Sequence, residues 1–332
     1  MKYIFVCSTH FHIYVTLLKC MMNKQGENHI YILDVLPNAN EILCKLKKES
    51  FVSSVSIIND RELGVETKNI PRIIRILFLK HYLDMYFSKI ILPDHDWIYI
   101  FWPNVFPIYL IWKYRNVILH EDGKNSIFLL HAKNWKSKIL NIFRLRHFGN
   151  VEYHQNIKYV ECQNINQLPH SLRHKFKQSD IGRLESQLND EEKQIIANIF
   201  SVQIVPSWMY ECSLLLTQPL FAHGFALNEE HQVEIYKKII ATYCKEDECI
   251  IIKPHPRDLV DYSIYDMGKK IYILKKETPF EVYKFIGVSF KKYITLWSTS
   301  IADIESSRVI HVTCDIDDYV SKEFSRRFPK IG

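Results

Sequence analysis

A strand that ends in a histidine between two prolines stands at residues 250–258, with the sequence Ile250-Ile251-Ile252-Lys253-Pro254-His255-Pro256-Arg257-Asp258. Such a continuous apolar run is typical of a strand buried on both faces of a parallel sheet. Ligands of these α/β sheets collect at the carboxyl ends of the strands, where His255 stands. The flanking prolines restrict the backbone on both sides of it. The stretch therefore predicts an α/β fold with a functional histidine at a strand end.

The rest of the chain alternates short β-branched or aromatic runs with longer helical patterns, which predicts parallel βαβ units. Expected strands cover residues 2–7, 29–33, 97–101, 116–119, 213–216, 249–253, 270–274, 293–296 and 309–313. Expected helices cover residues 12–22, 41–48, 72–87, 229–243, 280–286 and 301–306, with a polar helical pattern over 180–200. No GxGxxG follows a strand, so a dinucleotide-binding oxidoreductase is unsupported.

The length of 332 residues favours two domains, because single cores seldom grow this large. Pro206-Ser207 follows the polar helical pattern, and a second alternating series begins there. We expect domains at residues 1–200 and 208–332.

Composition is that of a globular protein, with 47% hydrophobic and 24% charged residues. The net charge of +6 suits anionic substrates or an anionic membrane surface. No nucleic-acid-binding motif occurs, so nucleic acid is not an expected partner. Eight cysteines without a CxxC pair favour a reducing compartment and argue against a zinc site.

The apolar runs near residues 74–83 and 98–112 are interrupted and fall short of the ~20 residues of a membrane span. No secretory signal is visible at the N-terminus. We expect a cytoplasmic protein. The basic segment 124–147 fits an amphipathic helix on the cytoplasmic face of the inner membrane. A surface helix with one buried face is the favoured alternative, because such helices are common.

Two further strand ends carry polar groups. Glu121-Asp122-Gly123 follows the strand at 116–119, and its glycine lets the loop turn tightly beside a ligand. Ser298-Thr299-Ser300 follows the strand at 293–296 and offers hydroxyl and N–H donors to an anion. The alternatives are an acidic turn and ordinary helix capping. Lys253 and Arg257 add charge suited to a phosphate.

These elements resemble motifs of bacterial sialyltransferases. Glu121-Asp122-Gly123, His255-Pro256 and Ser298-Thr299 match, in order, the paired-acid-glycine, His-Pro and paired-hydroxyl motifs of the lipooligosaccharide sialyltransferases of glycosyltransferase family 52 and of the capsular polysialyltransferases. Leu216-Thr217-Gln218-Pro219-Leu220 looks like the first strand-loop of their nucleotide-binding domain.

The resemblance implies a GT-B fold, in which two Rossmann-like domains face each other across a cleft. The first domain would hold a glycan acceptor, such as a galactose-terminated lipooligosaccharide or a capsule, and the second would hold CMP-sialic acid. Transfer would be inverting and independent of any metal or cofactor. Relatives also suggest a homodimer.

The resemblance also implies roles for single residues. Asp122 would be the general base, with Glu121 as the other candidate of the acid pair and His120 as the fallback. His255 would donate a proton or hydrogen bond to the departing phosphate. The expected substrate-binding residues are Gly123, Thr217, Gln218, Pro219, Lys253, Pro256, Arg257, Glu281, Ser298, Thr299 and Ser300. Among these, Glu281 would bind the ribose hydroxyls.

Two acidic clusters, Asp94-His95-Asp96 and Asp315-Ile316-Asp317-Asp318, resemble the metal-binding DxD motif of other glycosyltransferases. Their places in a turn and before a terminal helix favour structural roles, so we expect no essential metal. Two alternative functions stay open: a Kdo or CDP-glycerol type of transferase, and a non-catalytic protein that binds a glycan or nucleotide.

Overall fold

The computed structural model describes residues 1–60, 81, 83–101, 104–122, 155–163, 165, 174–202, 205–298, 300–301 and 304–327. The basic segment 124–147, Gly123 and Thr299 lie outside these residues. The chain divides into two compact units, Met1–Ile199 and Phe200–Gly332. In the described ranges, every helix is too short or too polar to cross a membrane.

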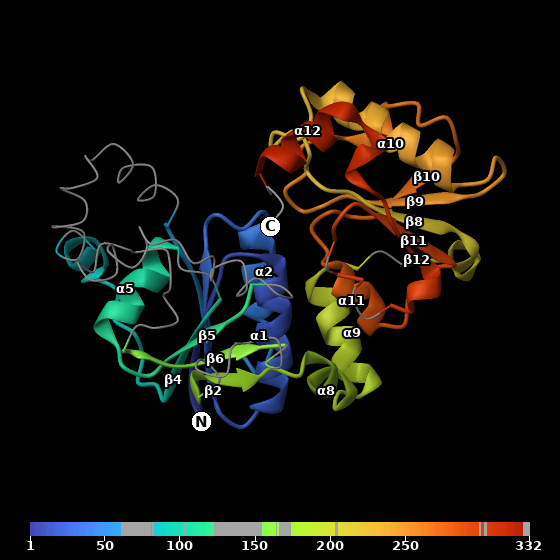
Figure 1. Cartoon of the computed structure of the whole chain (residues 1–332). Coiled ribbons are helices and arrows are strands. Elements are labelled where there is room, and N and C mark those ends of the chain that lie inside the picture. Colours follow the sequence, from blue (N-terminus) through green and yellow to red (C-terminus); the bar gives the residue numbers. More distant parts are fainter. Residues whose placement is uncertain are drawn as a thin grey trace. The chain divides into compact units, whose positions relative to one another are not determined.

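Unit 1 contains a sheet of seven parallel strands (Figure 1). They are β1 (Lys2–Cys7), β2 (Glu27–Leu33), β3 (Ser54–Ile58), β4 (Trp97–Ile100), β5 (Val117–His120), β6 (Ile157–Cys162) and β7 (Phe176–Gln178). Their order is β3-β2-β1-β4-β5-β6-β7, so the direction of winding reverses between β1 and β4. In open α/β sheets this reversal opens a ligand-binding crevice at the carboxyl ends of the strands.

Helices cover both faces of this sheet. They are α1 (His10–Met22), α2 (Ala39–Leu46), α5 (Val105–Lys113), α8 (Ile181–Ser186) and α9 (Asp190–Ile199). In Figure 1, α1 and α2 lie on one face and α5 on the other. Both faces are therefore apolar, as expected for a parallel sheet.

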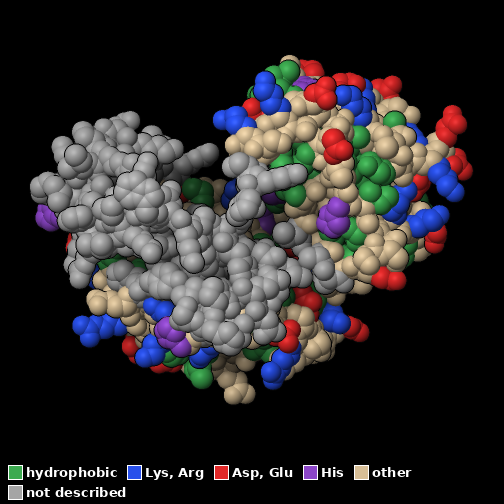
Figure 2. All heavy atoms as spheres, viewed as in Figure 1, with side chains coloured by type: hydrophobic (Ala, Val, Ile, Leu, Met, Phe, Trp, Pro, Cys, Tyr) green, Lys and Arg blue, Asp and Glu red, His purple; other side chains and the backbone are tan. Residues whose placement is uncertain are grey.

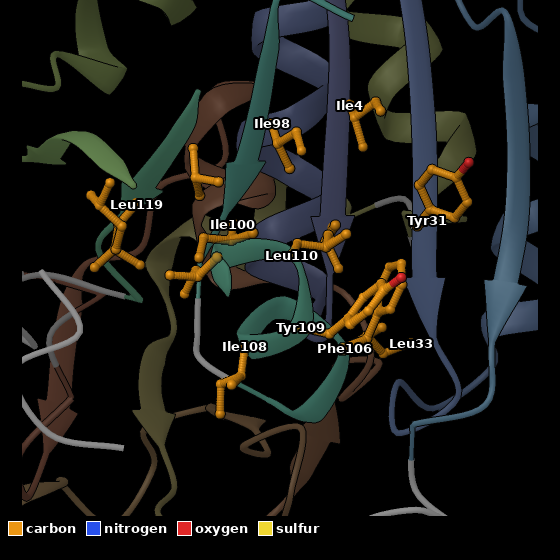
Figure 3. Packing of buried hydrophobic residues seen from close by; sticks show 14 of the residues in the cluster. Ile4, Tyr31, Leu33, Ile98, Ile100, Phe106, Ile108, Tyr109, Leu110 and Leu119 are labelled. Carbon is orange, nitrogen blue, oxygen red and sulfur yellow. The ribbon is translucent and has the colours of Figure 1, made fainter. Parts of the chain in front are cut away.

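Alternate residues of β1 go to opposite faces. Ile4 and Val6 pack in the core cluster under α5. Cys7 belongs to the opposite face of the strand and points to α1, where its Sγ lies 3.2 Å from Thr16 Oγ1. The residues of α5 that fill the core include Phe106, Tyr109 and Leu110 (Figure 3).

Unit 2 contains five parallel strands in the order β10-β9-β8-β11-β12. They are β8 (Ser213–Leu216), β9 (Ile250–Lys253), β10 (Ile271–Ile273), β11 (Lys292–Thr295) and β12 (Val309–His311). Leu215, Ile250 and Ile252 face α10 (Glu229–Tyr243) and α12 (Asp318–Arg327), and Leu214 and Ile251 face α11 (Phe280–Phe285). The winding reverses between β8 and β11. Short 3-10 turns are η4 (Ser207–Glu211), η5 (Tyr262–Ile264), η6 (Ser306–Arg308) and η7 (Cys314–Ile316).

The predicted α/β class is confirmed, and each of the nine expected strands is present within two residues of its predicted limits. Strands β3, β6 and β7 and helix α5 were not predicted. The polar helical pattern over 180–200 is two helices, because Asn189 starts a new one by exchanging side-chain bonds with Glu192. Of the helix expected over 72–87, the described residues 83–87 are helical.

The helix predicted over 301–306 is wrong for the residues described there. Ile301, Ile304 and Glu305 are not helical, and a single turn closes between the Ile304 N–H and the Ile301 carbonyl. Glu305 has φ −54° and ψ 127°, an extended conformation that leads into η6 and β12.

The face of unit 2 visible in Figure 2 carries Lys, Arg, Asp and Glu side chains interspersed with apolar ones. On that face the charges of the two signs are mixed, as on an ordinary solvated surface.

Leu110→Ala tests the packing of α5, because Leu110 is fully buried against the sheet of unit 1. We expect the free energy of unfolding to fall by about 2–5 kcal/mol, as for other leucines deleted from cores. Denaturant titration measures the change. Ile91→Ala is the control, since Ile91 is 88% exposed. Equal stability of the two variants would contradict this packing.

Candidate functional site

In unit 1, the loop after β1 places a histidine inside the first turn of α1. Thr9 is the N-cap of this helix, and its hydroxyl accepts the His12 backbone N–H at 3.2 Å. This cap directs His12 toward the carboxyl ends of the strands, where its ring stacks on Phe101 after β4 with centroids 4.5 Å apart. The histidine thus lies at the point where the winding of the sheet reverses.

The His12 ring joins this loop to the acid predicted after β5. Its Nε2 lies 2.8 Å from Asp122 Oδ1. Its Nδ1 faces the backbone N–H of Ser8 at 3.1 Å. Because a backbone N–H only donates, Nδ1 accepts, and the proton of the neutral ring stands on Nε2 and is donated to Asp122. The His12 side chain is fully buried, whereas that of Asp122 is 25% exposed.

The two acids of the predicted pair occupy different environments. Glu121 is 2% exposed, and its Oε1 accepts the backbone N–H of Gln163 at 2.7 Å. It therefore fastens the end of β6, while Asp122 reaches the surface.

His120, the fallback base, is fully buried. Its Nδ1 donates to the Glu121 carbonyl, and its Nε2 lies 2.8 Å from Ser179 Oγ. Burial, helped by the charge of Lys19, lowers its pKa to about 3. The ring is therefore neutral and engaged inside the protein, which does not suit a base that meets a substrate.

In unit 2, a buried carboxylate joins the loop after β8, helix α10 and the turn η5. Asp258, 1% exposed, accepts hydrogen bonds from the hydroxyls of Thr217 and Tyr262 and from Gln232 Nε2. The Thr217 Oγ1 in turn accepts the backbone N–H of His255 at 3.1 Å. The His-Pro loop after β9 is therefore held by the loop after β8 through two linked hydrogen bonds, of which the one to the Asp258 carboxylate is charge-assisted.

His255 is half-buried, and its ring is fixed from its own loop. Nδ1 accepts the backbone N–H of Arg257 at 3.1 Å, so the proton of the neutral ring stands on Nε2. No residue in the described part of the chain bonds to that Nε2. Burial, followed by the charges of Arg257 and Lys253, lowers the His255 pKa to about 4. At pH 7 the ring presents one neutral N–H donor.

Lys253, at the end of β9, is 3% exposed. Its ammonium donates to the carbonyls of Pro254 and Lys276 at 2.8 and 3.2 Å. Burial lowers its pKa to about 7, against the opposing charges of Glu281 and Glu277. The ammonium thus ties neighbouring loops together, and the phosphate contact expected of Lys253 stays a prediction.

The turn after β11 lies at the same edge of the sheet. The Ser298 N–H donates to Thr295 Oγ1 at 3.1 Å, and Ser298 Oγ accepts the Ser300 N–H at 3.3 Å. The remaining predicted residues of unit 2 stand on the loops after β8 and β9 or at the start of α11: Gln218 and Pro219, Pro256 and Arg257, and Glu281.

The two acidic clusters have structural partners. Lys2 binds Asp94 through its ammonium at 3.1 Å and Asp96 through its backbone N–H at 2.9 Å. Asp317 pairs with Lys238 and His231. Within the described ranges, no group of three or more His, Cys, Asp or Glu residues forms a candidate metal site.

Residues 96–315 match the model of glycosyltransferase family 52. The chain belongs to this family. An uncharacterized protein of Haemophilus influenzae strain Rd is 29% identical over 226 residues, which cover 67% of this chain and 68% of that protein. The resemblance drawn from the three motifs is thereby confirmed.

Solved structures show the same architecture. A sialyltransferase from Photobacterium damselae superposes with a TM-score of 0.53 and 12% identity over 99% of this chain and 79% of its own. The GT-B domain of a sialyltransferase from the same organism gives 0.52 and 11% over 98% and 96%. At these identities the likeness concerns the fold alone. The protein is a glycosyltransferase of the GT-B fold.

Sequence reasoning missed His12 and Asp258. His12 stands in Ser8-Thr9-His10-Phe11-His12, directly after the first strand, and this strand-end position was its one available signal. Asp258 closes the stretch that predicted the fold, but its burial was not readable from the sequence.

Lys253→Met tests the buried ammonium through pH. The pKa of Lys253 is about 7 in the fold and about 10.4 in an unfolded chain, so between these values the unfolded state binds more protons. Stability of the wild type relative to Lys253→Met should therefore rise from pH 7 to pH 10, measured by urea titration. Ile91→Ala, which removes no titratable group, is the control. A difference independent of pH would contradict the burial of a titrating Lys253.

Proposed function

We propose that this glycosyltransferase moves sialic acid from CMP-sialic acid to a hydroxyl of a cell-surface glycan, with inversion at the anomeric carbon. The main support is the His255 ring, which presents one N–H donor at the carboxyl end of β9. The Arg257 backbone N–H fixes the tautomer of the ring, and Thr217 holds the His255 backbone. Ligands of α/β sheets bind at such strand ends. The two Photobacterium damselae proteins of similar fold are sialyltransferases, which agrees with this choice.

The proposed reaction needs a base on the acceptor and a donor on the leaving group. An oxygen of the acceptor bonds to the anomeric carbon as the bond from that carbon to the CMP phosphate breaks. The acceptor proton passes to Asp122, and the electron pair of the broken bond leaves with CMP. Residues 1–200 are assigned to the acceptor and residues 208–332 to the nucleotide.

His255 Nε2–H donates a hydrogen bond to the CMP phosphate as negative charge develops on that phosphate. Because the ring is neutral before the donor binds, its contribution begins as a directed hydrogen bond. An adjacent phosphate anion raises the pKa of a histidine, so the ring also becomes a better proton donor as the bond breaks. Ser298 and Thr299 are assigned to the same phosphate.

A panel of CMP-, CDP- and UDP-sugars tests the donor, and His255→Ala tests the role of the ring. We expect release of CMP from CMP-sialic acid and a loss of ~10²–10³-fold in turnover for the folded variant. His231→Ala, at the start of α10 and paired with Asp317, is the control. Turnover of CMP-Kdo or CDP-glycerol alone would support those transferases instead. Ligand binding without turnover of any donor would indicate a binding protein.

Asp122→Asn and Glu121→Gln separate the two acids. Asp122→Asn keeps the size of the side chain but cannot take a proton, so transfer should fall by ~10²–10⁴-fold while CMP affinity stays unchanged. Glu121→Gln should lower the melting temperature and have only a small effect on the transfer rate. Glu121 is buried, and its carboxylate accepts the Gln163 backbone N–H. Transfer assays, calorimetry with CMP and thermal melts measure these effects. A larger loss of transfer in Glu121→Gln would reverse the assignment.

A further inference from the structure

We propose that His12 is the positioning residue of the catalytic base: its neutral ring, held as the Nε2–H tautomer, orients the Asp122 carboxylate toward the acceptor hydroxyl. This inference rests on the proposed function, because it gives Asp122 the base role assigned above. His12 and Asp122 are 110 positions apart in sequence and meet with 2.8 Å between Nε2 and Oδ1.

The first observation is that the tautomer is locked. The Ser8 backbone N–H points at His12 Nδ1, and Ser8 Oγ lies 3.1 Å from the same atom. If Nδ1 carried a proton, it could no longer accept the Ser8 backbone N–H, and that 3.1 Å hydrogen bond would be lost. The ring therefore presents its N–H to Asp122 in a fixed direction.

The second observation is that the ring has no freedom to turn. It is fully buried, and it lies nearly parallel to the Phe101 ring, with an interplanar angle of 11°. Thr9 also holds the His12 backbone through the helix cap. A donor fixed in this way restricts the rotation of the Asp122 side chain, and orientation of a reacting group is worth a large part of catalytic rate.

The third observation concerns charge. A cation beside a carboxylate lowers its pKa by 1–3 units and weakens it as a base. A neutral imidazole orients the carboxylate and leaves the pair with a net charge of −1. The arrangement thus combines a fixed direction with a carboxylate that still accepts a proton.

The other charged and titratable groups around His12 and Asp122 are either neutral or bonded to partners of their own. His120 on β5 is neutral, with its pKa lowered to about 3. Lys19 on α1 is paired with Glu161 of β6 at 2.6 Å. Glu121 is bound to the Gln163 N–H, and His10 is bonded through Nε2 to Asn38. The direction given to Asp122 is therefore argued from its bond to His12 Nε2 at 2.8 Å.

The test compares His12→Phe with His12→Gln. Phenylalanine keeps the aromatic contact with Phe101 but has no donor, so kcat should fall roughly 10–100-fold, as when other hydrogen-bonded partners of a reacting group are removed. The KM for the CMP-sugar should stay within about twofold, because the donor is assigned to unit 2. Glutamine carries an N–H near the position of Nε2 and should restore most of the rate. His29→Gln is the matched control, with wild-type transfer expected, because His29 is a buried histidine of β2 bonded to Ser54 of β3.

A double-mutant cycle separates positioning from stability. On an Asp122→Asn background, His12→Phe should cost no further rate, because there is no base left to orient. Equal losses on both backgrounds, or a wild-type kcat in folded His12→Phe, would overturn the proposal.

Nitrogen NMR gives a readout that does not depend on activity. The ¹⁵N shifts of His12 in the full-length protein at pH 7 should show a protonated Nε2 and an unprotonated Nδ1, and Asp122→Asn should shift the Nε2 signal. An Nδ1–H tautomer or an imidazolium would overturn the proposal, even if His12→Phe fails to fold. If the wild type uses another donor sugar, the proposed function fails, and the kinetic comparison is made with that sugar.

Discussion

The constraint on which the rest of the structure depends is that both sheets are parallel and covered by helices on both faces. Strands such as β8 and β9 are buried along their whole length, so polar groups that must meet a ligand can stand only where a strand ends. The candidate site residues Asp122, Thr217, His255 and Ser298 follow strand ends, and His12 lies in the first turn of α1 after β1. Fold and chemistry are therefore joined by topology: the reversal of strand order decides which loops become neighbours.

The two units solve the same physical problem with different groups. A loop at a strand end is flexible unless its polar atoms find partners, and a misplaced catalytic group loses much of its effect. In unit 2 the buried Asp258 carboxylate gathers Thr217, Gln232 and Tyr262, and Thr217 holds the His255 backbone. In unit 1 the ring of His12 performs the corresponding task for Asp122. Both arrangements use backbone N–H groups to set the state of a histidine.

Features of the fold that depend on a local sequence pattern could be predicted, and features that depend on contacts between distant residues could not. Continuous apolar runs such as Ile250-Ile251-Ile252 predicted the central strands, because their pattern is local. Strand β3 was missed because its exposed Ser54 and Ser56 alternate with apolar residues over only five positions. The motifs singled out Asp122 and His255 as candidates, yet nothing local shows that His12 meets Asp122 or that the Lys253 ammonium is buried. Burial and long-range pairing depend on the folded chain and leave little trace in one sequence.

The low pKa of His255 has a consequence for how the protein meets anions in general. A site built around a permanently charged cation attracts sulfate, free phosphate and many metabolites with similar strength. A neutral N–H donor contributes little long-range attraction. It forms a strong hydrogen bond only with an acceptor oxygen that lies close to the direction of the N–H bond. Under the proposed function, a bound phosphate would raise the pKa of this ring, so the affinity for a phosphate ester would depend on pH where the ring titrates. In the proposed site, the His255 ring would add a directional hydrogen bond to the charge attraction expected of Arg257.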